Sequence, residues 1–422
     1  MSVIRHDDSG INASRPAAAE AGRRRGAVAP RPDTLCTLAA CIFLLAACSS
    51  HAPPKVDDTR VKEFAGRGYL TDDRFSVGTT FSNWTVGEDS FDIAWTVPVS
   101  GQRLPVVVYL PGLGESRSSG EKWRTAWALA GYAVLSVQLL DADQHVWSSN
   151  AARGGDLVML ARERYAKEAA AARLKGLTSL LAELQKHHGS DEALLQRLDL
   201  SRIAIAGFDV GAYTAMLVAG ETPKGEADPI RLPIPISAFV ALSPYADFSG
   251  KAFSARYQSI TAPVLSVSGN ADADNAGVVS SPSVRKAPFE YMPSHDAYLL
   301  WLRNATHAVF SGSGPSMLED SADSATPRHG DGQGSPQGGS RRGRHGGNGQ
   351  SGTASGNPGG FGDRQSTGAA ASPTERALSA NLIQGVTTAF LDSYLKQDPT
   401  AKEWLQKDVA RWLGERGELK RK

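Results

Sequence analysis

The sequence feature that most constrains the fold is the run IAIAGFDVG at residues 203–211. A short apolar segment leads into a Gly-x-Asp-x-Gly turn, and residues 212–219 continue as an apolar stretch with helical composition. Gly207 and Gly211 lack a Cβ, so the backbone can turn sharply and pass close to itself at both positions. The pattern predicts a strand, a tight turn with Asp209 at its apex, and a helix, which is the layout of a nucleophile elbow.

Apolar runs and helical segments alternate along most of the chain. Nearly continuous apolar runs are typical of strands buried in a parallel sheet with both faces covered. The alternation therefore predicts an α/β protein with a three-layer architecture and a mostly parallel central sheet. Besides the strand before Asp209, the predicted strands are residues 91–99, 104–110, 133–137, 238–242, 263–269 and 298–303; the predicted helices include one around Trp123 and Trp127 and those at 157–186, 377–395 and 401–413.

The N-terminal region has the pattern of an export signal. Three arginines at residues 23–25 precede an apolar run at 35–47, which is too short for a typical membrane span. The run ends in LAAC at residues 45–48, which resembles the bacterial lipobox. That resemblance implies a signal peptide over residues 1–48 and lipidation of Cys48, with Ser49 favouring the outer membrane, facing the periplasm, over the inner one. An ordinary signal peptide or a short signal anchor is the alternative.

Composition divides the rest of the chain. Residues 49–70 are polar and contain Pro53 and Pro54, so we expect a tether. Residues 71–422 are predicted to form a single domain, interrupted at about 312–373 by an insertion rich in Gly, Ser and Pro. Such a composition buries too little apolar surface to offset the entropy of ordering, which predicts disorder there.

Charge and cysteine content limit the classes of partner and cofactor. The formal net charge of +1 over 422 residues gives no global bias toward nucleic acid. The three cysteines all lie at or before residue 48, so the remainder cannot form disulfides. We find neither a Cys/His cluster with metal-ligand spacing nor a phosphate-binding glycine loop, and therefore expect no metal or organic cofactor. A small-molecule substrate and a membrane, through the lipid anchor, are the expected partners; the oligomeric state stays open.

Two further side chains follow predicted strands in the order that an elbow-based site requires. Asp272 comes after the strand at 263–269, with Asp274 as a second candidate, and His307 comes after the strand at 298–303. The carboxyl ends of parallel strands meet at one edge of a sheet, where sites form. The turn PGLG at residues 111–114 fits an oxyanion hole, with the backbone amides of Leu113 and Val210 as donors.

These motifs together resemble one branch of a known family. The segments YLPGLGESR at 109–117, GFDVGAYT at 207–214, PVLSVSG at 263–269 and ATHAVFSG at 305–312 resemble the bacterial α/β-hydrolases related to dienelactone hydrolase and platelet-activating-factor acetylhydrolase. The resemblance covers roughly residues 75–312 and 376–408. It implies the three-layer α/β-hydrolase fold and hydrolysis of carboxylic esters by a Ser-Asp-His triad without a metal.

The sequence departs from that family at the elbow. Asp209 stands where the family has Ser, and Phe208 where members often have His. A carboxylate attacks an ester carbonyl poorly, because the product is a mixed anhydride, but it can attack saturated carbon. The resulting ester on Asp209 would be hydrolysed by water that His307 activates, with Asp272 orienting the imidazole. Haloalkane dehalogenases and epoxide hydrolases on this fold use such an Asp-His-acid triad.

Three interpretations of the site stay open at this point. The first is a lipid-anchored hydrolase acting through Asp209, Asp272 and His307 on a small ester-like or alkyl electrophile. The features against the alkyl route are Val210, where a Trp commonly follows the nucleophile, and the absence of Tyr from residues 221–235. In the second interpretation, Asp209 or His307 acts as a general base on water in ester hydrolysis. The third is a catalytically silent binding or scaffold lipoprotein.

Overall fold

The computed structural model describes residues 55–71, 74–188, 190, 192–222, 231–274, 276–293, 295–313 and 371–422. The predicted signal peptide, Cys48, the first part of the predicted tether and nearly all of the insertion lie outside the described residues. None of the helices in the described ranges combines the length and the apolar character needed to cross a bilayer.

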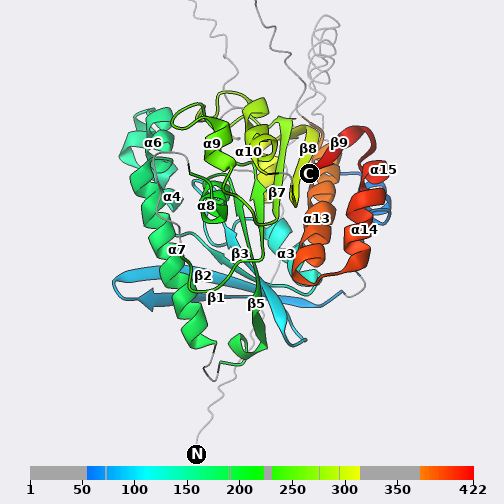
Figure 1. Ribbon diagram of the computed structural model, residues 1–422, viewed down its shortest axis with the longest axis horizontal. Coiled ribbons are helices and arrows are strands. Elements are labelled where there is room, and N and C mark those ends of the chain that lie inside the picture. Colours follow the sequence, from blue (N-terminus) through cyan, green and yellow to red (C-terminus); the bar gives the residue numbers. More distant parts are fainter. Residues whose placement is uncertain are drawn as a thin grey trace, which may run out of the picture. The chain divides into compact units, whose positions relative to one another are not determined.

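A nine-stranded mixed sheet forms the centre of the described chain, with the strand order β1-β2-β4-β3-β5-β6-β7-β8-β9 (Figure 1). The strands from β4 to β8 in that order pair in parallel, whereas β1 with β2, β2 with β4 and β8 with β9 pair antiparallel. The predicted α/β class with a mostly parallel sheet is thus confirmed. The strands are β1 (Val77–Val86), β2 (Asp89–Pro98), β3 (Leu104–Leu110), β4 (Ala133–Val137), β5 (Leu198–Phe208), β6 (Ala238–Leu242), β7 (Val264–Ala271), β8 (Ala297–Thr306) and β9 (Gly417–Arg421).

Helices cover both faces of the sheet. The long helix α7 and the elbow helix α8 pack on one face, and α2, α3, α13 and α14 pack on the other (Figure 1). Alternate residues of the central strands serve the two cores, as Val106 and Val107 of β3 do, and both are fully buried. The helices are α2 (Asp58–Ala65), α3 (Glu121–Leu129), α4 (Asp141–Gln144), α5 (Asn150–Arg153), α6 (Leu157–Arg164), α7 (Lys167–His187), α8 (Val210–Ala219), α9 (Phe253–Tyr257), α10 (Ala287–Tyr291), α11 (His307–Ser311), α13 (Pro373–Leu395), α14 (Pro399–Lys407) and α15 (Val409–Leu413).

Two expectations about local structure are corrected. Residues 58–65, placed in a tether from their polarity, form helix α2, which the Asp57 side chain caps by accepting a hydrogen bond from the Arg60 N–H. Its Phe64 is buried and stacks on Trp412, with ring centroids 5.2 Å apart. A single buried aromatic residue thus docks a helix whose other residues are mostly polar, and the polar composition gives no indication of that contact.

The helical stretch at 157–186 is also not continuous. It divides into α6 and α7 because Ala166 adopts an extended conformation, with ψ at 160°. The Arg173 guanidinium, reaching back from α7, donates a 2.6 Å hydrogen bond to the carbonyl of Arg164 at the end of α6. The break leaves Tyr165 between the two helices, where its side chain enters the site described below.

Candidate functional site

The turn between β5 and α8 has the backbone geometry of an elbow. Asp209 lies at φ 53° and ψ −114°, a region that non-glycine residues rarely occupy. A Cβ on Gly207 would lie 2.3 Å from the carbonyl carbon of Gly211, and one on Gly211 would lie 2.0 Å from the carbonyl oxygen of Leu110. The two glycines are therefore required by the close approach of backbone segments, and Asp209 projects from the strained apex between them.

The Asp209 carboxylate is held by two donors. Its Oδ2 accepts a 3.2 Å hydrogen bond from the Leu113 N–H, in the turn after β3. Its Oδ1 accepts a hydrogen bond from the hydroxyl of Tyr165. The amide that we predicted as an oxyanion-hole donor therefore already binds an oxygen of Asp209 itself. Val210, the other predicted donor residue, follows Asp209 as the first residue of α8 and is buried.

His307 and Asp272 meet beside this carboxylate. His307 is the first residue of α11, directly after β8, and its Nδ1 lies 2.7 Å from Oδ1 of Asp272. The His307 Nε2 lies 4.0 Å from Oδ1 of Asp209, which is too long for a hydrogen bond. The structure thus brings the three predicted side chains together from the ends of three strands, with the imidazole facing the carboxylate of the elbow across a short gap.

Asp272 is fully buried and has several partners besides His307. The hydroxyls of Ser243 and Ser268 donate to its two carboxylate oxygens at 2.8 and 2.7 Å, and the Arg285 guanidinium lies 3.5 Å away. Ser243 itself has a positive φ of 52°, so a second strained residue lies at this edge of the sheet. Its Oγ is also 3.0 Å from Nδ1 of His307. Sequence analysis missed Ser243, Ser268 and Arg285.

The pKa values of the pair shift in opposite directions. Burial raises the pKa of Asp272, but the charges of Arg285 and His307 and the hydrogen bonds outweigh it, so the pKa lies below the ordinary value. Burial lowers the pKa of His307, whereas the hydrogen bond and charge of Asp272 raise it above the usual 6.5. Asp272 therefore remains an anion at neutral pH and strengthens the imidazole as a base.

The second candidate acid is excluded from this cluster. Asp274 accepts hydrogen bonds from the backbone N–H groups of Val278 at 3.2 Å and Val279 at 2.7 Å. Its carboxylate thus organises the loop after β7. The two aspartates are only two residues apart, and the direction in which the loop leaves the strand separates their roles.

Tyr165 is a further residue of the site that sequence analysis did not anticipate. Its ring stacks on Tyr245 with centroids 4.2 Å apart and also contacts Tyr213 at 5.7 Å. Burial, together with the charge and hydrogen bond of Asp209, raises the pKa of Tyr165 well above its ordinary value, so the phenol stays neutral and acts as a donor. No motif marks this residue, because it lies within a segment whose composition predicts an uninterrupted helix.

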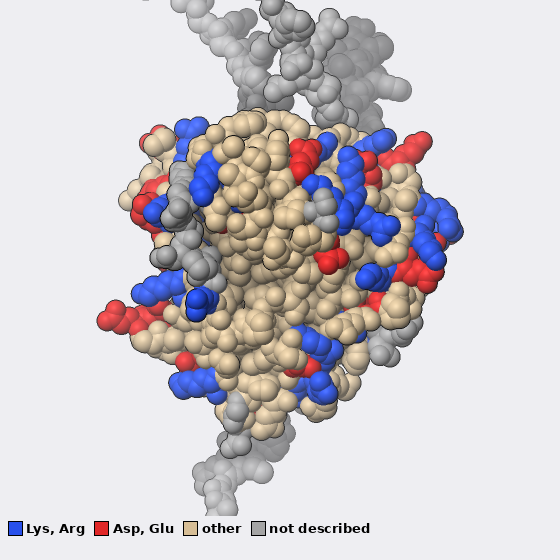
Figure 2. Space-filling view, viewed as in Figure 1, with Lys and Arg blue, Asp and Glu red and all other residues tan. Residues whose placement is uncertain are grey.

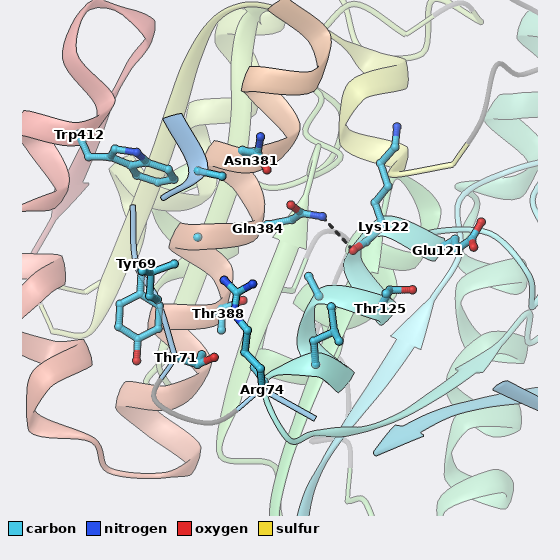
Figure 3. Close-up of a pocket in the computed structure, with 16 residues that line it drawn as sticks. Tyr69, Thr71, Arg74, Glu121, Lys122, Thr125, Asn381, Gln384, Thr388 and Trp412 are labelled. Atoms are coloured by element: carbon cyan, nitrogen blue, oxygen red, sulfur yellow. Dashed lines mark hydrogen bonds between the residues drawn. The ribbon is translucent and has the colours of Figure 1, made fainter. Parts of the chain in front are cut away.

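A cavity of about 580 Å³ lies elsewhere, between α2, α3 and α13 (Figure 3). Arg74 extends toward Thr388 at its centre, and Trp412 and Tyr69 line one side. None of Asp209, Asp272 and His307 lines this cavity, and residues 72 and 73, next to Arg74, lie outside the described residues. Within the described ranges, no group of three or more His, Cys, Asp or Glu residues could hold a metal ion.

Charged side chains of both signs occupy the periphery of one face, around a broad area without Lys, Arg, Asp or Glu (Figure 2).

No known family model matches this sequence, and no curated protein matches it. The nine-stranded, mostly parallel sheet is compatible with an α/β-hydrolase-like fold, and the comparisons assign no family.

Proposed function

We propose that this protein is a hydrolase in which Asp209 attacks a saturated carbon of a small alkyl electrophile. The observation that supports this most directly is the position of the Asp209 carboxylate. Its Oδ2 is bound by the Leu113 N–H, and its Oδ1 lies on the side of His307. Such an arrangement suits a carboxylate that becomes the acyl part of an ester intermediate.

In the first step, Oδ1 of Asp209 forms a bond to the substrate carbon while the bond to the leaving group breaks. A halide departs with the electron pair, whereas an epoxide oxygen keeps the pair, stays on the alkyl group and takes a proton from solvent. In both cases an alkyl ester remains on Asp209. The Tyr165 hydroxyl must release Oδ1 before attack, and the ester oxygen that then forms is a weaker acceptor for it.

In the second step, His307 takes a proton from water, and the hydroxide attacks Cγ of Asp209. Negative charge develops on Oδ2, where the Leu113 amide stabilises it. The tetrahedral intermediate then expels the alcohol, which receives the proton from His307. Asp209 loses its remaining proton to solvent, and the net reaction consumes one water molecule. His307 Nε2 lies 4.0 Å from Oδ1 of Asp209. The imidazole is therefore close to the carboxyl group that water attacks, but it is not hydrogen-bonded to it.

Ester hydrolysis by a general base has less support from the same geometry. A substrate carbonyl would have to displace Oδ2 of Asp209 from the Leu113 amide. Its developing oxyanion would then lie beside a carboxylate, and like charges at a few Å in a poorly solvated site repel each other by a few kcal/mol, on the order of what one oxyanion donor contributes.

Sequence motifs support a family and a location for this protein. The motifs around residues 109–117, 207–214 and 305–312 support membership of the α/β-hydrolase branch related to dienelactone hydrolase and platelet-activating-factor acetylhydrolase. The lipobox-like residues 45–48 support lipidation of Cys48 and attachment to the outer membrane, facing the periplasm. Both rest on resemblance.

The covalent step is tested with a His307→Ala variant, because loss of the base should trap the ester on Asp209. The variant is incubated with 1,2-epoxyhexane and, separately, with 1-bromohexane, and is examined by intact-mass and peptide mass spectrometry. We expect one adduct that maps to Asp209 and persists, whereas the wild-type protein releases it.

The matched control is Asp209→Asn within the His307→Ala background, which preserves the shape of the side chain and removes the nucleophile. No adduct should form. If neither electrophile labels the His307→Ala protein, and short p-nitrophenyl esters are hydrolysed only after Asp209→Ser, then the Asp-alkyl route is wrong and a silent binding or scaffold protein becomes the better description.

A further inference from the structure

A second carboxylate, that of Glu115, lies in the same turn as Leu113. Its Oε2 accepts a 2.9 Å hydrogen bond from the N–H of Gly112, the residue directly before Leu113. Gln138, the residue directly after β4, holds the same turn, because its Nε2 donates to the carbonyl oxygens of Gly112 at 3.0 Å and Glu115 at 3.1 Å. The Gly112 carbonyl belongs to the same peptide group as the Leu113 N–H, and the Gly112 N–H belongs to the peptide group before it. The hydrogen bonds of Gln138 and Glu115 therefore set the orientation of the Leu113 amide.

The other oxygen of Glu115 contacts the segment that carries the histidine. Oε1 accepts hydrogen bonds from the hydroxyls of Ser311 and, at 3.1 Å, Ser313. Ser311 is the last residue of α11, and His307 is its first. One carboxylate thus connects the backbone beside Leu113 to the far end of the short helix that begins at His307, across 196 residues of sequence.

We propose that Glu115 is a positioning residue that fixes the Leu113 amide and His307 relative to each other on the two sides of Asp209. The catalytic importance of this alignment rests on the proposed function. The alignment itself can be measured without a substrate. The hydrogen bonds of Glu115 go to the turn and to α11, and it acts on the surroundings of Asp209 through them. Burial and, to a smaller extent, the charge of Asp209 raise the pKa of Glu115, and the hydrogen bonds from Ser311, Gly112 and Ser313 lower it, leaving the pKa above the ordinary value.

Two substitutions have different effects on the bridge that the Glu115 side chain forms between the Gly112 N–H and the hydroxyls of Ser311 and Ser313. Glu115→Ala removes both acceptors, so the turn and the helix lose their common partner. Glu115→Gln can keep the bridge, because its carbonyl can accept from the Gly112 N–H while its NH₂ group donates to the serine hydroxyls, which can rotate to accept. We therefore expect the glutamine to rescue most of what the alanine loses. Glu121→Ala, an exposed glutamate in the first turn of the neighbouring helix α3, is the control.

The alignment is measured by NMR on the full chain, labelled with ¹⁵N-leucine and ¹³C-histidine. In Glu115→Ala, we expect the Leu113 amide proton to move upfield as its hydrogen bond to Asp209 weakens, and the titration midpoint of His307 to change. Glu115→Gln and Glu121→Ala should keep both signals near their wild-type positions. Unchanged Leu113 and His307 signals in a folded Glu115→Ala protein would overturn the proposal, as would a Glu115→Gln protein disturbed as strongly as the alanine variant.

If Glu115→Ala does not fold, the double variant Ser311→Ala/Ser313→Ala takes its place, since it removes only the donors on the helix side. The titration midpoint of His307 should then change. An unchanged midpoint would contradict the positioning role of Glu115.

The rates of adduct formation and release at Asp209 provide a second test. With 1,2-epoxyhexane, release of the adduct uses both Leu113 and His307, so Glu115→Ala should slow release at least about tenfold and slow adduct formation less. If no electrophile labels Asp209 in any background, the proposed function fails while the NMR result still decides the role of Glu115. If labelling occurs and the NMR signals do not respond, only the positioning role fails.

Discussion

The most unusual residue of the site is Asp209, and its surroundings explain how an aspartate can occupy an elbow. The strained conformation at φ 53° costs free energy that favourable contacts must offset. The Leu113 amide and the Tyr165 hydroxyl supply hydrogen bonds to the charged carboxylate, which are stronger than bonds between neutral groups. These contacts stabilise Asp209 whether or not it reacts, so the chemical experiment rather than the geometry separates a nucleophile from a structural aspartate.

At the residue scale, Asp272→Asn should change the pH dependence of adduct release. His307 must be neutral to accept a proton from water, so release should fall as the pH drops through its raised pKa. The substitution removes the charge of Asp272, and in the ester intermediate Asp209 no longer carries the charge that also raises this pKa. The lowering effects of burial and Arg285 remain, so the midpoint should move to lower pH. We also expect the maximal rate to fall by about 10² or more, because the imidazole loses its orienting partner. The measurement is the release rate between pH 5 and 9, and an unchanged midpoint would contradict the assignment of Asp272.

The same pair also links stability to pH with opposite signs. The lowered pKa of Asp272 contributes stability that is present above its unfolded value of 3.8 and is lost as the pH falls through the folded pKa. The raised pKa of His307 contributes stability that is present below 6.5 and is lost as the pH rises through the folded pKa. Between the two folded-state pKa values, Asp272 is an anion and His307 is a cation, so each charge stabilises the other.

At the scale of elements, the elbow depends on how closely α8 approaches the strands. Gly211→Ala would place a methyl group 2.0 Å from the carbonyl oxygen of Leu110, and that oxygen belongs to a strand at the centre of the sheet that cannot easily move. We expect a loss of more than about 3 kcal/mol in the free energy of unfolding, together with loss of adduct formation. The control is Gly78→Ala in β1, where no atom lies within 4 Å of the added Cβ. That change should stay within about 1 kcal/mol of the wild type in urea denaturation. A Gly211→Ala protein as stable as the control would contradict the packing argument.

The break between α6 and α7 shows how an element boundary serves the site. Uninterrupted, the stretch from residue 157 to 186 would be one helix of favourable composition. The extended backbone at Ala166 instead leaves Tyr165 stacked on Tyr245 and bonded to Asp209. Helix propensity differences amount to a few tenths of a kcal/mol per residue, so a buried aromatic contact and a charge-assisted hydrogen bond outweigh them.

At the scale of the whole molecule, Asp392 joins segments that are far apart in the sequence. From α13 it accepts hydrogen bonds from the hydroxyls of Tyr69 at 2.8 Å and Tyr132 at 2.7 Å, and it pairs with Lys396 at 2.6 Å. Asp392 is 2% exposed. The helix that follows the insertion is thereby tied to the chain before β1 and before β4.

We therefore expect Asp392→Ala to lower the free energy of unfolding by about 2–4 kcal/mol, because the substitution removes the acceptor of the buried Tyr132 hydroxyl and one partner each of Tyr69 and Lys396. The rate of adduct formation at Asp209 should be unchanged, since α13 contributes no residue to that cluster. Glu403→Ala removes an exposed ion pair with Lys407 on α14 and should have no measurable effect in the same urea titration. Equal stability of the two variants would show that Asp392 is not an anchor.

The central part of the fold could be predicted from the sequence because burial leaves a local pattern there. The strands at 104–110, 133–137 and 238–242 were predicted with the bounds that the structure shows. The edge strands β1 and β9 were not predicted, because both are largely exposed and carry no apolar run. The predicted helix at 401–413 is two helices, α14 and α15, with Asp408 between them.

By itself, the sequence determined the class of fold, the elbow at Asp209 and the order in which Asp272 and His307 follow it, because chain order, apolar runs and glycine spacing are local properties. Only the tertiary structure decided that Asp272 rather than Asp274 faces His307, that Tyr165 and Leu113 hold the Asp209 carboxylate, and that Glu115 joins the turn to α11. These pairings depend on the directions in which loops leave the sheet and on contacts between residues as many as 196 positions apart. Hydrogen bonds form over about 3 Å in space, and no local pattern in the chain records which distant groups packing brings within that distance.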